Sequence, residues 1–241
     1  MIQINNLTMK YPNGRGIFDV TFDVKEGTVV GFVGPNGAGK TTTIRCLLGY
    51  MHALAGTATI GGKDCFNDAP EIAKELGFIA GEPVFPDGMG GAEYLHFLTK
   101  IRAGKDHERE ATIKSRIKEL CEYFEIDPKG QIKHMSKGMK QKVALIAAFM
   151  HDPKVYILDE PSSGLDPIMQ HKFIDLVLRE KGRGKTILMS THIYDEIEKT
   201  ADIVVIIREG HIAASDKASN LKQRKRSEYV VDIDYYLGGG K

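Results

Sequence analysis

Long apolar runs are missing from this chain of 241 residues. The longest, such as residues 143–150, fall far short of the ~20 residues that a membrane-spanning helix needs. Residues 1–5 have neither a basic lead nor a long apolar region, so we expect no signal peptide. The sequence also has no internal repeat and no sustained heptad pattern, which argues against a long coiled coil.

The chain also has few cysteines and almost no net charge. The three cysteines, Cys46, Cys65 and Cys121, have no metal-ligand spacing and are typical of a reduced, cytosolic protein. A formal net charge of +1 argues against a main partner that is a nucleic-acid backbone. The composition, 42% apolar and 27% charged residues, is typical of a globular protein. The chain is also long enough to bury a substantial core.

The most informative segment is GPNGAGKT at residues 34–41, which matches the phosphate-binding pattern G-x-x-x-x-G-K-[ST]. An apolar strand at residues 29–33 precedes it, and helical spacing of apolar residues predicts a helix over residues 42–51. Glycines in such a loop let backbone N–H groups turn toward a phosphate, next to the positive end of the helix. The residues that we predict to bind nucleotide here are Gly34, Pro35, Asn36, Gly37, Ala38, Gly39, Lys40, Thr41 and Thr42.

Two of these residues have specific predicted roles. We expect Lys40 to reach the β- and γ-phosphates and to act in catalysis, and the Thr41 hydroxyl to hold Mg²⁺.

The rest of the chain indicates an α/β protein. Alternation of apolar and polar residues predicts a half-exposed strand at residues 18–24, antiparallel to residues 2–9. Short apolar runs at 155–158, 186–189 and 203–207 alternate with helical patterns, which predicts a parallel sheet covered on both faces. Between about residues 83 and 151 the pattern becomes helical, so an all-helical insert interrupts the core.

Polar residues follow two of the predicted buried strands. Asp159 and Glu160 end the strand at residues 155–158, where ligand sites lie in open α/β sheets. We expect Asp159 to coordinate Mg²⁺ and Glu160 to orient, or take a proton from, an attacking water. His192 follows the strand at 186–189 on the same rim and can bond the γ-phosphate and couple to Glu160. Alone, each feature is also an ordinary strand end or a solvated histidine; beside the phosphate loop, the catalytic interpretation is favoured.

In this order and spacing, the motifs resemble the ATP-binding subunit of an ABC transporter, from Tyr11 to about Gly210. The most specific element is MSKGMKQ at residues 135–141, which is similar to the family signature Leu-Ser-Gly-Gly-Gln. The resemblance implies that Ser136 and Gly138 contact the γ-phosphate of ATP held by the opposite subunit of a head-to-tail dimer. Ser136 can also cap the helix that follows, whose N-terminus offers N–H groups to an anion.

The resemblance assigns two further residues to the nucleotide site. Tyr11 stands where the family places an aromatic ring that stacks on adenine, an interpretation favoured over that of an ordinary tyrosine at a strand end. Asp166 ends a segment, SGLD, that resembles the loop through which the subunits communicate. Asp166 followed by Pro167 also reads as an N-cap with a proline in the first helical turn, which is a sufficient structural reason for both.

The chain departs from the family at three places. The family has a glutamine that senses Mg²⁺ and the transmembrane partner where this chain has Gly81, and Glu82 is our candidate to replace it as a metal ligand. In the signature, Lys137 replaces a glycine and Met139 replaces the glutamine. The added lysine should not harm phosphate binding, whereas loss of the glutamine alters that half of the site.

The predicted fold is therefore an α/β P-loop NTPase core of the RecA-like type, with an antiparallel β subdomain and an inserted α-helical subdomain. We expect an ABC-type ATP-binding domain at residues 1–220, with its helical subdomain at about 83–151, and a short C-terminal extension at 221–241. The basic run at residues 221–226 either contacts anionic lipid or is merely solvated.

The implied function is ATP binding and hydrolysis, with ATP and Mg²⁺ as cofactors. The expected partners are a separate transmembrane permease and a second ATP-binding subunit, identical or a paralogue, with no nucleic acid. The protein would then lie in the cytoplasm, peripheral to the inner face of the cell membrane. The signature is similar to that of bacterial multidrug and bacteriocin exporters, which favours export. The alternative is a soluble, non-transport ABC ATPase that acts in assembly of an iron–sulfur cofactor. Glu160 and His192 argue against a regulatory module without turnover.

Overall fold

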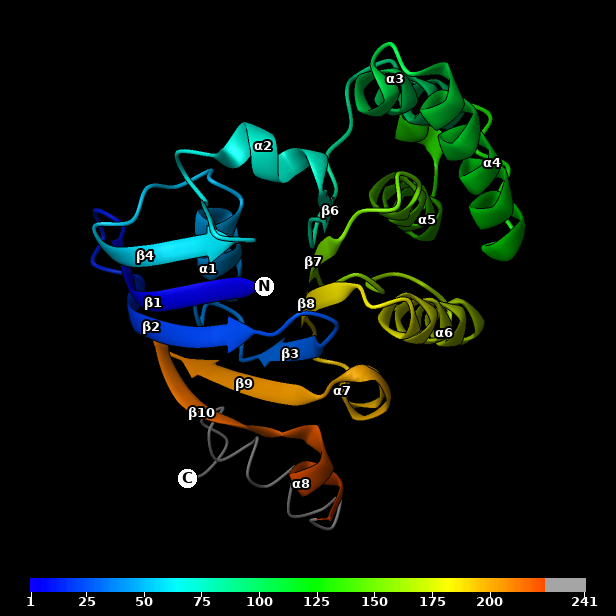
Figure 1. Cartoon of the computed structure of the whole chain (residues 1–241). Helices are drawn as coiled ribbons and strands as arrows, with labels where there is room; N and C mark the ends of the chain where they lie inside the picture. The colour runs from blue at the N-terminus through cyan, green and yellow to red at the C-terminus, as the bar shows by residue number, and fades with distance from the viewer. Residues whose placement is uncertain (224–241) are drawn as a thin grey trace.

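The computed structural model describes residues 1–223, so the predicted C-terminal extension lies outside this range apart from its start. Figure 1 shows two sheets with helices around them. The strands are β1 (Ile2–Lys10), β2 (Gly16–Val24), β3 (Val29–Val33), β4 (Ala55–Ile60), β5 (Lys63–Asp64), β6 (Leu76–Ile79), β7 (Val155–Asp159), β8 (Thr186–Ser190), β9 (Ile203–Arg208) and β10 (His211–Lys217). The helices are α1 (Lys40–Leu47), α2 (Ala69–Lys74), α3 (Gly91–Ala103), α4 (His107–Tyr123), the 3₁₀ turn η1 (Ile132–His134), α5 (Lys137–Phe149), α6 (Pro167–Gly182), α7 (Tyr194–Thr200) and α8 (Ala218–Gln223).

The central sheet has the strand order β10-β9-β3-β8-β7-β6. The strands from β9 to β6 are parallel, and β10 adds an antiparallel edge. Strands β3, β7 and β8 are buried throughout their length, as the continuous apolar runs predict. The predicted parallel sheet is thus confirmed, and the carboxyl ends of β3, β7 and β8 meet along one rim.

Alternate residues of the central strands point into two hydrophobic cores. Val29, Tyr156 and Leu158 pack with apolar residues of α3 to α7. Val30 and Ile157, on the opposite face, pack with α1 and with the apolar face of β1 and β2. The sheet is therefore covered on both faces, because each face of a parallel strand must be kept from water.

The second sheet is antiparallel, with the strand order β2-β1-β4-β5. Strands β1 and β2 pair in the predicted antiparallel manner, with Ile2 opposite Val24 and Ile4 opposite Phe22. In Figure 1 this sheet lies on the side of the central sheet away from α3, α4 and α5, the helices between residues 83 and 151. No helix within residues 1–223 is long and apolar enough to cross a membrane.

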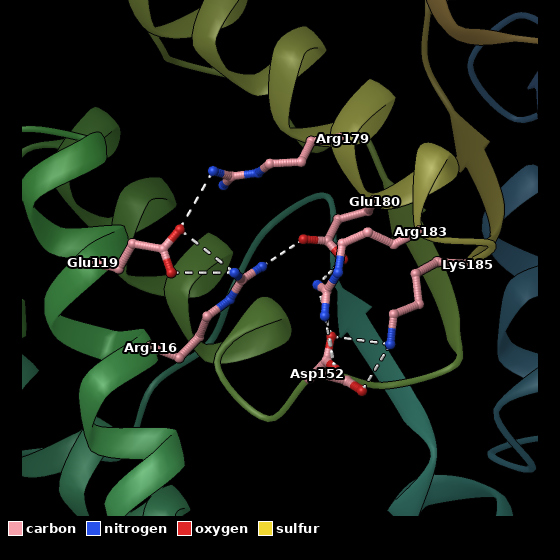
Figure 2. A network of polar contacts seen from close by, with 7 residues as sticks. All are labelled: Arg116, Glu119, Asp152, Arg179, Glu180, Arg183 and Lys185. Atoms are coloured by element: carbon pink, nitrogen blue, oxygen red, sulfur yellow. Dashed lines mark hydrogen bonds and ion pairs between the residues drawn. The ribbon is translucent and has the colours of Figure 1, made fainter.

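A network of ion pairs joins the helical segment to the core where α4 meets α6 (Figure 2). Arg116 of α4 donates to Glu180 of α6, whose side chain is fully buried. Glu180 also pairs with Arg183 at 2.8 Å, and Asp152 pairs with Arg183 and Lys185, each at 2.9 Å. Arg116 thus ties α4 to α6, while Arg183 at the end of α6 holds the same buried carboxylate from its own helix.

One helix differs from the sequence prediction. The helix expected at residues 42–51 is α1, which begins at Lys40 and ends at Leu47. It ends because Gly49 takes a left-handed φ of 71°. The Gly49 and Tyr50 N–H groups then donate to the carbonyls of Cys46 at 3.1 Å and Arg45 at 2.9 Å, a Schellman motif that closes the last turn.

Candidate nucleotide-binding site

The loop between β3 and α1 requires glycine for two distinct reasons. Gly39 has a φ of 117°, and a Cβ there would lie 2.8 Å from Cγ2 of Ile17. At Gly34, a Cβ would lie 2.4 Å from the carbonyl oxygen of Ile207 on β9. A side chain at either position would therefore displace the loop from the sheet, which fixes the path of the backbone toward α1.

Lys40, the first residue of α1, turns back into the loop. It is buried, and its Nζ donates to the carbonyl oxygens of Gly34 at 2.6 Å and Pro35 at 3.2 Å. Burial lowers the pKa of Lys40, while the carboxylates of Glu160 and Asp159 act in the opposite direction. The ammonium group thus lies inside the loop, close to both carboxylates that end β7.

Thr41 and Asp159 meet although 118 positions separate them in the sequence. The Thr41 hydroxyl donates to Oδ2 of Asp159 at 3.0 Å, and Ser190 at the end of β8 donates to Oδ1. Asp159 is only 5% exposed. Two of the three residues predicted to hold Mg²⁺ are therefore adjacent, and Ser190, which has no predicted role, fixes the carboxylate. The sequence signal for a site role of Ser190 is its position at the end of a buried strand.

The described residues contain no group of three or more histidine, cysteine, aspartate or glutamate side chains that could hold a metal ion. A hydroxyl and a carboxylate still fit Mg²⁺, because this ion keeps several waters and often takes its remaining ligands from substrate phosphates.

Glu160 and His192 contact each other across the rim. Nδ1 of His192 lies 2.5 Å from Oε2 of Glu160. Glu160 adopts a left-handed φ of 48°, and its N–H donates to the carbonyl of Ser190 at 2.9 Å. A non-glycine residue in this region is uncommon, although Asn6, Asp19, Glu125, Asp152 and Glu209 share it here. The neighbouring strands β7 and β8 thus bring Glu160 and His192, two of the three predicted catalytic residues, together.

Gly81 also borders the two carboxylates. A Cβ at Gly81 would lie 3.7 Å from Cβ of Glu160 and 3.8 Å from Cγ of Asp159. A longer side chain at this position would therefore touch both acids, and glycine supplies none. Glu82 is exposed, and its role as a metal ligand stays a prediction.

Tyr11 lies beside the helix that follows the loop. Its hydroxyl is 3.5 Å from Oγ1 of Thr42 and 3.4 Å from Sδ of Met51. The hydroxyl therefore lies against the helix that follows the phosphate loop, and the predicted stacking of the ring on adenine stays a prediction.

The signature segment begins α5. Ser136 is the N-cap, accepting a hydrogen bond from the Met139 N–H at 3.2 Å, as predicted. A Cβ at Gly138 would lie 2.9 Å from the carbonyl oxygen of Gly164, in the loop after Glu160. The structure thus places Gly138 against that loop of its own chain; contact of Ser136 and Gly138 with a second subunit's nucleotide stays a prediction.

Asp166 caps α6, accepting a hydrogen bond from the Met169 N–H at 3.0 Å, with Pro167 in the first turn. This confirms the structural reading of the pair and leaves its predicted part in nucleotide binding open.

A separate cavity of about 340 Å³ lies between the core and the helical segment. Its lining is mostly apolar and comes from the end of α1, from α2, β6, α3 and α5. The aromatic members are Tyr50, Phe78 and Tyr94, and Tyr50 is 69% exposed. It shares no lining residue with the predicted nucleotide site.

Comparison with known proteins places these features in a family. The family model described as "ABC transporter" matches residues 17–163, more than half of the chain. The chain is 33% identical to "ABC transporter ATP-binding protein NatA" of Bacillus subtilis over 92% of this chain and 88% of that protein. It is 36% identical to "Bacitracin transport ATP-binding protein BcrA" of Bacillus licheniformis over 94% of this chain and 72% of that protein.

Solved structures of ATP-binding subunits also superpose on this chain. "Structure of ATP binding subunit of ABC transporter" superposes with a TM-score of 0.85 at 31% identity, covering 97% of this chain and 99% of that one. The dimeric ATP-binding cassette MJ0796 bound to ADP and Pi superposes with a TM-score of 0.80, covering 90% and 99%. At 21% identity, the second likeness supports the P-loop NTPase fold alone.

Proposed function

The chain belongs to the ABC transporter family as an ATP-binding ATPase subunit, and from this membership we propose that it powers a separate membrane permease, as one of two subunits that share their nucleotide sites. The observation that carries the proposal is the rim of the central sheet. There Lys40, Thr41, Asp159, Glu160 and His192 converge from α1, β7 and the end of β8.

Each group has a role that follows from its position. Lys40 neutralises charge on the β- and γ-phosphates, in the bound substrate as well as in the transition state. Glu160 orients the attacking water and accepts its proton, and His192 fixes that carboxylate through Oε2. Thr41 and Asp159 would hold Mg²⁺, which would supply charge neutralisation at the phosphate oxygens.

We propose that Ser136 completes the site of the second subunit. Ser136 is exposed and begins α5, and a helix N-terminus attracts anions. Replacing Gly138 would be a poor test, because its Cβ would press on the Gly164 carbonyl within the same chain. Ser136→Asp is sharper, since aspartate keeps an N-cap oxygen while placing a negative charge toward the partner's γ-phosphate.

Mixing two inactive variants tests the shared site. Ser136→Asp and Lys40→Ala chains should each lack ATPase activity, whereas their mixture should regain part of it, because one of the two shared sites then carries neither defect. Ser136→Thr, which keeps the cap without the charge, is the matched control and should stay active. If chains demonstrably exchange and no activity returns, the shared site is wrong or both sites must fire together, and cross-linking residue 136 to the partner's phosphate loop separates these outcomes.

For the permease, we propose that the apolar cavity beside Tyr50 receives one of its segments. The transporter names of the relatives support a permease over the iron–sulfur assembly alternative. The cavity is lined by both the core and the helical segment, and exposed Tyr50 gives it an aromatic edge. Tyr50→Glu should abolish co-purification with the membrane subunit and leave ATP binding intact. Retention of a membrane partner by this variant would remove the cavity from the proposal.

We also propose that the permease exports the transported compound. Export is supported by the form of the signature and by one relative whose name states bacitracin transport. The protein would then sit at the inner face of the membrane through the permease.

A further inference from the structure

The loop between β7 and α6, residues 160–166, is held by two buried side chains from different parts of the molecule. Gln141 of α5 donates through Nε2 to the Pro161 carbonyl at 2.6 Å. On the other side, the Ser162 hydroxyl donates to Oε1 of Glu196 of α7. Gln141 and Ser162 are each 1% exposed and Glu196 is fully buried. The loop is therefore clamped between the helix that carries the signature and the helix that follows His192.

A buried carboxyl group at position 196 destabilises the fold relative to an apolar residue, so packing alone does not explain Glu196. Burial raises the pKa of its carboxyl group, and the Ser162 and Thr191 hydroxyls oppose that shift. The Glu160 carboxylate nearby adds to the upward shift, while His192 acts against it. Oε2 of Glu196 is buried without a hydrogen-bond partner in the described part of the chain. An apolar residue of similar volume would avoid these costs.

The loop also contacts the signature directly. The Gly164 carbonyl faces Gly138 so closely that a Cβ there would lie 2.9 Å away, and a Cβ at Gly164 would meet Cγ of Lys137 at 2.9 Å. Glu160, at the start of the same loop, is held in its left-handed conformation. A displacement of α5 would thus reach Glu160 through Pro161 and Gly164, and the His192 segment through Ser162 and Glu196.

We propose that Glu196 and Gln141 are positioning residues that act through the 160–166 loop and keep Glu160 and His192 in register with the signature helix. The inference rests on the roles proposed above for Glu160 and the signature. Neither residue is expected to touch ATP. Their loss should therefore lower kcat while leaving both the Kd for ATP and the calorimetric binding stoichiometry unchanged, whereas unfolding of part of the sample would lower the stoichiometry.

The test uses the full chain and compares Ser162→Ala, Glu196→Ala, their double variant and Glu196→Gln. Steady-state ATPase assays give kcat, and calorimetry gives the Kd for ATP. We expect Ser162→Ala and Glu196→Ala each to lower kcat at least about tenfold, as small misplacements of reacting groups do. The double variant should be no slower than the single variants, because both remove the same contact. Glu196→Gln should retain activity, since its amide oxygen can accept from Ser162.

Gln141 has its own variant. Gln141→Leu removes the hydrogen bond to Pro161 and should likewise lower kcat at unchanged Kd.

The matched control for Glu196→Ala is Glu198→Ala. It removes a partly exposed carboxylate from the same helix and should behave as wild type.

The outcomes are distinct. Wild-type kcat in Ser162→Ala would overturn the proposal even if Glu196→Ala fails to fold, because Ser162→Ala deletes only a hydroxyl. Multiplying effects in the double variant would also overturn it, as would a loss of ATP affinity equal to the loss of kcat. A wild-type chain that hydrolyses no ATP, alone or with its membrane partner, would instead refute the proposed function before any variant is compared.

Discussion

His151 offers a stability prediction whose size follows from its surroundings. The residue is 7% exposed, its Nε2 lies 3.1 Å from the Leu76 carbonyl, and its Nδ1 has no partner in the described part of the chain. Burial, with a smaller contribution from Arg102, lowers its pKa from 6.5 to about 4. The folded protein therefore keeps this imidazole neutral at pH values where the unfolded chain is already protonated.

The pH dependence has a definite sign. Between pH 6.5 and about 4 the unfolded chain binds one more proton at this position, so the free energy of unfolding falls as the pH is lowered through this window. A shift of this size corresponds to about 3 kcal/mol by pH 4. In a protein of this length, that loss is about 6–12 °C in Tm.

The assay is urea unfolding of wild type and His151→Gln at several pH values from 7.5 to 4. Glutamine stays neutral, so the variant should lose about 3 kcal/mol less than wild type over this range, whatever its stability at pH 7.5. His96→Gln, at an exposed position on α3, is the matched control and should follow wild type. Parallel curves for wild type and His151→Gln down to pH 4 would refute the reasoning.

Three further substitutions test other parts of the molecule. Glu160→Gln should lower ATP turnover by at least ~10²-fold and leave ATP-loaded dimers that accumulate on gel filtration; near-normal turnover would contradict its role as the base. Lys40→Ala should weaken ATP binding itself, because its charge acts in the ground state, and equal affinity by calorimetry would remove the assignment. Glu180→Ala should destabilise the fold by about 1.5–3 kcal/mol, because it removes the buried acceptor of Arg116 and Arg183, which keep their pairs with Glu119 and Asp152. Glu122→Ala, which removes an exposed pair at 4.0 Å with Lys118, should cost less than about 1 kcal/mol in the same urea titration; equal losses would show that burial of Glu180 does not matter.

Much of the fold is encoded locally and was predictable. The continuous apolar runs of β3, β7 and β8 and the alternation in β2 identify buried and half-buried strands, because side chains alternate across a strand. Ser136 and Asp166 cap their helices as expected, since a cap needs only a few consecutive residues. The helix predicted at residues 42–51 runs past the end of α1, because the apolar spacing continues to Met51 whereas Gly49, in the left-handed region, ends the helix.

The sequence alone determined that a phosphate loop exists and that two acids end a buried strand, because each motif is contiguous and follows a short-range rule. Only the tertiary structure decided which distant residues meet. The parallel register that sets Asp159 beside Ser190, the hydrogen bond from Thr41 to Asp159, and the clamp on the loop by Gln141 and Glu196 all join segments that are far apart in the chain. Such contacts depend on how strands are ordered in the sheet and helices packed on it, and no local pattern in one sequence records that order.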